Sequence, residues 1–146
     1  YIDGKKAILS SQSTLTRADG VSLQAHEAEW NEIFDGIKEV VDIVAFQDGH
    51  ADYHELPDYF AVNKQLADRY GLRCWTNAES FDRDMPIKFL PIKWEKLRLK
   101  LEAAKQAGLE KAITFEFSHF MSPQSAYVQA HHLYNRYLEY AQEGPF

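Results

Sequence analysis

The 146-residue sequence contains a single cysteine, no long apolar run and no excess of positive charge. The lone Cys74 excludes an internal disulfide and any metal site built from several cysteines. Sixteen Lys and Arg against twenty-two Asp and Glu give a net charge of −6, which argues against nucleic acid as a partner because phosphate binding needs clustered positive charge. No apolar run approaches the roughly 20 residues of a transmembrane helix, so we predict no membrane span.

Familiar site motifs are also missing from the sequence. It has no phosphate-binding G-x-x-x-x-G-K-[ST] loop, no G-x-G-x-x-G and no G-x-S-x-G. His50 and His54 are four residues apart but fall in an expected loop, and the adjacent His131 and His132 point in different directions on a helix. We therefore predict no metal and no cofactor.

Four short apolar runs predict the strands of a parallel sheet. Nearly continuous apolar character over five to seven residues is typical of strands that are covered on both faces. The predicted strands lie near residues 6–11, 41–47, 72–77 and 112–117.

Segments with helical periodicity follow each predicted strand. Their apolar stripes run over residues 30–41, 59–70, 94–104 and 126–141. We expect Ser22 to cap the first helix, Pro91 to open the third, and Ser122 with Pro123 to start the fourth. The basic residues between Lys93 and Lys100 are interpreted as a solvent-exposed face.

This order of elements predicts an α/β fold with four consecutive β-α units and parallel strands. The strand starts are about 31 to 39 residues apart, and an eight-stranded α/β barrel averages roughly 31 residues per unit. We therefore expect residues 1–146 to form a single domain, the C-terminal half of such a barrel. A small doubly wound sheet is the alternative, but it usually carries a fifth strand, and we find none. Because the first residue is Tyr1, we expect a piece of a longer protein.

Acidic and amide residues gather where the predicted strands end. The carboxyl ends of parallel strands meet at one edge of the sheet, where α/β proteins bind their ligands. Carboxylates beside planar amides and aromatic rings are typical of sugar sites, and glycosidases need two carboxyl groups. The catalytic candidates are Asp48, Glu79 and Glu116. The candidates for substrate binding are Gln47, Trp75, Asn77 and His119.

Alternation along the last strand predicts which way Glu116 points. Thr114 and Glu116 share one face, and Ile113, Phe115 and Phe117 share the other. We expect the apolar set to face the helices, which would leave Glu116 pointing into the barrel interior.

Three segments resemble a bacterial family of unknown function: VAFQDG at 44–49, WTNAESF at 75–81 and ITFEFSHFMSP at 113–123. The members look like TIM barrels of the glycoside-hydrolase type, often from gut Bacteroidetes and commonly exported. The resemblance implies that this chain supplies strands five to eight. In the wider clan of retaining barrel glycosidases the nucleophile is a glutamate ending the seventh strand, which matches Glu79. The clan's acid residue follows the fourth strand, outside this chain.

The leading hypothesis is a glycoside hydrolase-like domain acting on carbohydrate, with Glu79 as nucleophile or base. Two alternatives stay open: a noncatalytic carbohydrate-binding barrel, and a fragment of a larger barrel enzyme that is inactive alone. A half barrel leaves two sheet edges and one face of its core uncovered. We therefore expect the missing N-terminal half barrel, or a second copy of the chain, as a partner.

Overall fold

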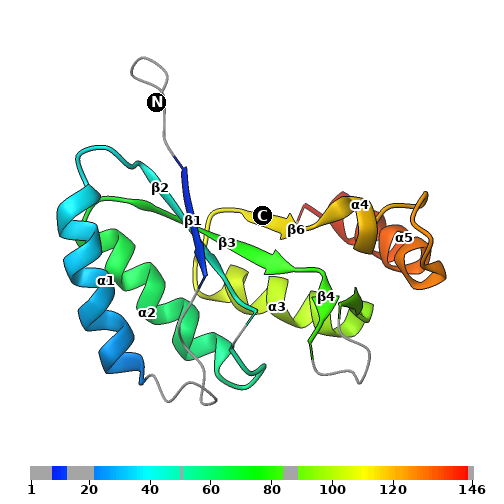
Figure 1. Cartoon of the computed structure of the whole chain (residues 1–146), viewed down its shortest axis with the longest axis horizontal. Coiled ribbons are helices and arrows are strands. Elements are labelled where there is room, and N and C mark those ends of the chain that lie inside the picture. Colours follow the sequence, from blue (N-terminus) through cyan, green and yellow to red (C-terminus); the bar gives the residue numbers. More distant parts are fainter. Residues whose placement is uncertain (1–7, 13–21, 50, 84–88, 145–146) are drawn as a thin grey trace.

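The computed structural model describes residues 8–12, 22–49, 51–83 and 89–144, in which strands and helices alternate (Figure 1). The strands are β1 (Ile8–Gln12), β2 (Ile43–Gln47), β3 (Arg73–Glu79), β4 (Phe81–Asp82), β5 (Leu90–Pro91) and β6 (Ala112–Phe115). The helices are α1 (Leu23–Ile37), α2 (Leu56–Arg69), α3 (Trp94–Gln106), α4 (Phe117–Phe120) and α5 (Val128–Gln142).

The main sheet has the strand order β1-β2-β3-β6, and every neighbouring pair is parallel. Gln47 is level with Asn77 across β2 and β3, and Glu79 is level with Phe115 across β3 and β6. The prediction of an α/β fold with a parallel sheet is confirmed. Because these strands are parallel, the residues that follow β2, β3 and β6 come out at one edge, the carboxyl edge of the sheet.

Local signals explain where the first two helices begin and end. The Ser22 hydroxyl accepts a hydrogen bond from the Ala25 amide at 3.1 Å, so the predicted N-cap is confirmed. Pro57 lies in the first turn of α2, where its missing N–H costs no hydrogen bond. Gly71 follows α2 with a φ of 70°, a left-handed conformation that glycine adopts without steric cost.

Two predicted helix starts are wrong. Pro91 lies in β5, which pairs antiparallel with β4, and α3 begins later, after an N-cap at Lys93. The sequence gives no sign of this hairpin because both of its strands are two residues long. Ser122 does not cap the last helix; its hydroxyl accepts from the Gln124 amide at 3.0 Å in a turn, and α5 begins at Val128.

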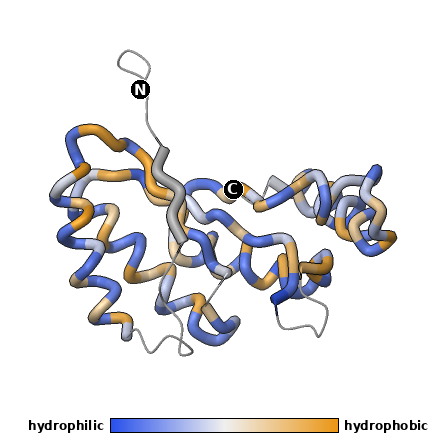
Figure 2. The backbone as a smooth tube through the Cα atoms, in the orientation of Figure 1, coloured by the Kyte–Doolittle hydropathy of each residue, from blue (hydrophilic) through white to orange (hydrophobic). Residues whose placement is uncertain are grey.

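Helices α1, α2 and α3 all lie on one side of the main sheet (Figure 1). Figure 2 shows apolar and polar residues alternating along these helices, as expected for helices that bury one face. Two apolar clusters fill the layer between helices and strands. The first joins α1 and α2 to β2 and contains Trp30, Phe34, Phe46, Tyr59 and Leu66. The second joins α3 to α5 and contains Trp94, Leu97, Leu101, Met121 and Leu133.

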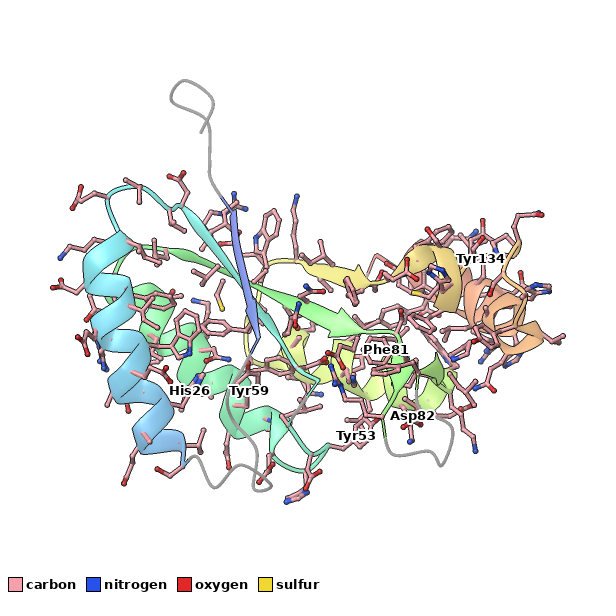
Figure 3. The ribbon with its side chains drawn as sticks, in the orientation of Figure 1. His26, Tyr53, Tyr59, Phe81, Asp82 and Tyr134 are labelled. Carbon is pink, nitrogen blue, oxygen red and sulfur yellow. The ribbon has the colours of Figure 1, made fainter. Side chains whose placement is uncertain are left out.

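A buried polar pair ties α1 to α2 inside the first cluster. Nε2 of His26 lies 2.7 Å from Oδ1 of Asn63, and both side chains are fully buried. The His26 ring also packs 5.6 Å from the ring of Tyr59 (Figure 3). Burial lowers the pKa of His26 because the charged imidazolium would lose its hydration. Tyr59 also donates a hydrogen bond to the Gln47 carbonyl at 2.9 Å. The His26–Asn63 pair, which packs against Tyr59, therefore helps to fix the carboxyl end of β2.

The prediction for the faces of the last strand is wrong. Ala112 packs on the second cluster beside the helices, whereas Ile113 and Phe115 lie on the opposite face and are 38% and 50% exposed. The reversal follows from the register, because Phe115 is level with Glu79 and Ile113 with Asn77. The described part of the chain therefore leaves apolar side chains on the sheet face that no helix covers.

No helix among the described residues is both long enough and apolar enough to cross a membrane.

Candidate functional site

The candidate site lies at the carboxyl edge, where β2 and β3 end side by side. Asp48 directly follows β2, and Glu79 is the last residue of β3. Both carboxyl groups are buried, with 1% of Asp48 and 3% of Glu79 exposed. The structure therefore brings together two of the three carboxylates that the sequence singled out.

Asp48 ties the end of β2 to the end of β3. Its Oδ1 accepts a hydrogen bond from the Glu79 backbone amide at 3.0 Å, and Nζ of Lys100 lies 3.3 Å from the same oxygen. The ammonium group also donates to the Glu79 carbonyl at 3.3 Å. Burial raises the pKa of Asp48, and the positive charge of Lys100 counteracts part of that rise.

Glu79 is held by two parallel hydrogen bonds from one guanidinium group. Nε and Nη2 of Arg83 donate to its two carboxylate oxygens at 2.7 and 2.6 Å. Such a bidentate pair fixes the plane of the carboxylate as well as its charge. Arg83 is held in turn by ring contacts, because its guanidinium carbon lies 5.1 Å from the centre of the Phe81 ring.

Gly49 approaches this carboxylate so closely that a larger residue would collide with it. A Cβ at position 49 would lie 2.1 Å from Cδ and from both oxygens of Glu79. The glycine after Asp48 therefore leaves room for Glu79 to reach its position.

We expect Gly49→Ala to lower the free energy of unfolding by about 1–3 kcal/mol, because the added methyl must push Glu79 away from Arg83. Urea denaturation of the full-length protein measures the change. The matched control is Gly36→Ala in α1, where nothing lies within 4 Å of the added carbon. Equal stability of the two variants would contradict the close approach.

Glu116 does not point into the interior as predicted, because the strand ends one residue earlier and Glu116 caps α4. Its carboxylate accepts from the amides of Ser118 and His119 at 3.1 and 2.8 Å, and Nδ1 of His119 lies 2.5 Å from Oε1. Burial acts to raise the pKa of Glu116, but the contacts with His119 and the Ser118 amide together outweigh burial and lower that pKa. Glu116 and His119 thus form a separate pair on α4.

The remaining predicted residues lie at two different heights on β2 and β3. Gln47 and Asn77 are level with each other, next to the two buried carboxylates. Trp75 lies four residues before Glu79, about 13 Å back along the strand at 3.3 Å per residue. Its ring is flanked by Arg73 and Lys111 at 5.8 and 5.3 Å, near the amino ends of the strands. Trp75 therefore does not join this site.

Two site residues were missed in the sequence. Lys100 is 6% exposed, so the interpretation of residues 93–100 as a solvent-exposed face is wrong at this position. A signal was present, because Lys100 falls three residues after Leu97 on the apolar stripe of α3. Arg83 carries no such signal, since its position depends on the β4–β5 hairpin that follows β3.

A group of three ligand-type side chains, two exposed and one half-buried, lies before α2. Asp52, His54 and Glu55 each bring one ligand atom within 4.8 Å of the others. Glu55 already accepts a hydrogen bond from the Asp52 amide at 3.2 Å. The three side chains are therefore close together because they belong to the turn that leads into α2. We assign no metal to this turn. His50, the other half of the predicted His50–His54 spacing, lies outside the described residues.

Comparison with known proteins places these residues in a family. Residues 4–127 match the family model described as "Domain of unknown function (DUF4434)". A crystal structure from Bacteroides thetaiotaomicron VPI-5482, described as that of a putative alpha-L-fucosidase, is 68% identical with a TM-score of 0.89. The match covers 94% of this chain but only 44% of that one, so the chain spans less than half of its relative. No curated protein matches.

Proposed function

The chain belongs to the DUF4434 family, and on this premise we propose that it forms the C-terminal half of a glycoside hydrolase-like TIM barrel. Three observations support the half barrel. The parallel strands follow sequence order, helices α1, α2 and α3 cover one side of the sheet, and Ile113 and Phe115 are exposed on the other. The relative is also more than twice as long as the matched region. We propose that an N-terminal half barrel covers this face, with a second copy of the chain as the alternative partner.

We further propose that the barrel hydrolyses a glycoside and that Glu79 is its nucleophile. The observation that carries this proposal is the buried Glu79 carboxylate at the carboxyl edge, oriented by Arg83. The guanidinium occupies one lone pair of each oxygen, which leaves a second lone pair for attack on the anomeric carbon. Attack would form a glycosyl ester as the bond to the leaving oxygen breaks, and water would then hydrolyse the ester.

The other polar residues take supporting parts in this proposal. Asp48 and Lys100 would position Glu79 through its backbone, and Gln47 and Asn77 lie where they can donate to sugar hydroxyls. The lowered pKa of Glu116 makes it a poor proton donor near pH 7, so we propose that the leaving oxygen receives its proton from a residue of the other half barrel. His119, which is exposed beside Glu116, remains a candidate for contact with a more distant part of the sugar.

A noncatalytic carbohydrate-binding barrel is the second candidate. One observation favours it: Arg83 engages both oxygens of Glu79, which is also how a purely structural carboxylate is held. The two candidates differ in turnover and agree in binding.

Assays on the full-length protein separate these candidates. We expect release of 4-nitrophenol from one of a panel of 4-nitrophenyl glycosides, with the α-L-fucoside as the first substrate because of the description of the relative. Titration calorimetry with the free sugars measures binding in parallel. Binding without release of nitrophenol or reducing ends, on this panel and on polysaccharides, would identify a binding barrel and overturn the proposed hydrolase.

A further inference from the structure

Four phenylalanine rings form a cluster beside the Glu79–Arg83 pair, which we name the aromatic platform. The central ring, Phe81 in β4, lies 5.3 Å from Phe89, 5.1 Å from Phe120 and 6.3 Å from Phe115, measured between ring centres. The rings come from the β4–β5 hairpin, from β6 and from α4, so segments far apart in the sequence build the platform. Figure 3 shows Phe81 next to β4, at the end of the sheet where β3 leads into the hairpin.

Two contacts place the platform next to Glu79. Arg83, which binds both oxygens of Glu79, lies over two platform rings, 5.1 Å from Phe81 and 5.9 Å from Phe89. Phe115 is level with Glu79 in the parallel pair of β3 and β6, so their side chains leave the sheet on the same face. The platform and the Glu79 carboxylate therefore share Arg83 as a contact and lie on the same face of the sheet.

The platform is buried at its centre and open at its edge. Phe81 is 5% exposed, whereas Phe89 and Phe115 are 48% and 50% exposed. Phe115 is the last residue of β6, so a half barrel that covers Ile113 deeper along the strand would leave Phe115 at the carboxyl edge, beside the site. Phe89 also has a φ of 61°, a left-handed conformation that costs free energy in a bulky residue.

The chemistry of the platform favours an apolar part of a sugar. The four rings themselves offer no hydrogen-bonding group, and Arg83, which lies over two of them in the described part of the chain, is already paired with Glu79. A hydroxymethyl group placed against these rings would lose its hydrogen bonds to water without replacement. A methyl group in the same place would bury apolar surface at no such cost.

We propose that the aromatic platform binds the C6 methyl side of a 6-deoxyhexose whose anomeric carbon lies at Glu79. This inference rests on the proposed function, because it takes Glu79 as the sugar-binding end of the site. It adds a specificity determinant: Phe89 and Phe115 select a 6-deoxy sugar over the same sugar with a hydroxyl at C6.

The test compares L-fucose with L-galactose, which differ only in that hydroxyl. Binding to the full-length protein is measured by titration calorimetry or NMR. We expect the parent to prefer L-fucose by about 10-fold to 100-fold in Kd, the range over which an apolar pocket discriminates against one added hydroxyl. Two variants should reduce this preference to about threefold or less. Phe115→Ala removes one exposed ring, and Phe89→Asn supplies a polar partner while tolerating the positive φ.

Phe117→Ala is the matched control. Phe117 is also 50% exposed, but its ring packs against Tyr134 in α5, with 6.1 Å between the ring centres. The control should keep the parent preference. Melting curves show whether each variant is folded. If Phe115→Ala does not fold, the test relies on Phe89→Asn alone.

Three results would overturn the inference: no preference in the parent, an unchanged preference in folded Phe89→Asn, or an equal loss in the Phe117→Ala control. An unchanged preference in Phe89→Asn would indicate that the rings pack against the other half barrel instead, and an equal loss in the control would show that the effect is not specific to the platform. Because binding is measured without turnover, the inference and the proposed hydrolase can fail separately. A platform-dependent preference for L-fucose in a protein that cleaves no glycoside would support the former and contradict the latter.

Discussion

Replacing Glu79 with glutamine in the full-length protein should lower kcat on a cleaved glycoside by about a thousandfold or more. Glutamine keeps the size of the side chain but cannot form the glycosyl ester, and it removes the negative charge that stabilises an oxocarbenium-like transition state. Since this loss is specific to the transition state, the Kd for the free sugar should change little.

The matched control for this variant is Glu110→Gln. Glu110 also pairs with an arginine, Arg73, whose Nε lies 2.6 Å from Oε2 of Glu110 at the other end of the sheet. Glu110→Gln removes a carboxylate from an arginine pair that lies away from the candidate site at the carboxyl edge. It should therefore leave kcat unchanged. Undiminished turnover of Glu79→Gln would refute the nucleophile assignment. A loss of about 1–3 kcal/mol in unfolding free energy, with activity falling only in proportion to folded protein, would assign Glu79 a structural role.

The largest expected effect on stability belongs to Lys100→Met. Lys100 and Asp48 are 7% and 0% exposed at their side chains, so the variant leaves a carboxylate buried without its cation. Removing one partner of a buried pair costs about 3–5 kcal/mol, measurable by urea denaturation near pH 7. The control is Lys64→Met, which breaks the exposed Lys64–Asp68 pair of α2 and should cost about 1 kcal/mol or less.

The pH dependence of the Lys100→Met effect gives a second measurement. Burial raises the folded-state pKa of Asp48 above 3.8, so ionising Asp48 destabilises the folded protein as pH rises above that value. Without Lys100 this cost grows. The stability difference between parent and variant should therefore shrink as pH falls, because a protonated Asp48 no longer needs the cation. A difference that stays constant as pH falls would show that Lys100 acts through packing alone.

The sequence predicted the parallel sheet and the meeting of Asp48 and Glu79 because both depend on local patterns. Apolar runs mark the strands, and carboxylates directly following two adjacent strands must come out at one edge. The placement of Glu116 failed because strand periodicity was extended past Phe115, where the side chain instead caps α4.

The partners of the carboxylates depend on tertiary structure. Arg83 reaches Glu79 only because a hairpin of two-residue strands turns the chain after β3. The apolar stripe of α3 indicates that Lys100 is buried, but only the structure shows that it lies beside Asp48 at the end of β2. The faces of the last strand were reversed because the prediction assumed that helices cover its apolar side.

The Asp48–Lys100 contact also has a consequence for folding kinetics. It joins residues 52 positions apart and links β2, in the first apolar cluster, to α3, which carries much of the second. Such a contact forms only when both clusters are in place, so we expect it to be absent from the folding transition state. Loss of Lys100 would then speed unfolding and leave the folding rate almost unchanged. The candidate site would be among the last parts of the molecule to assemble and among the first to open.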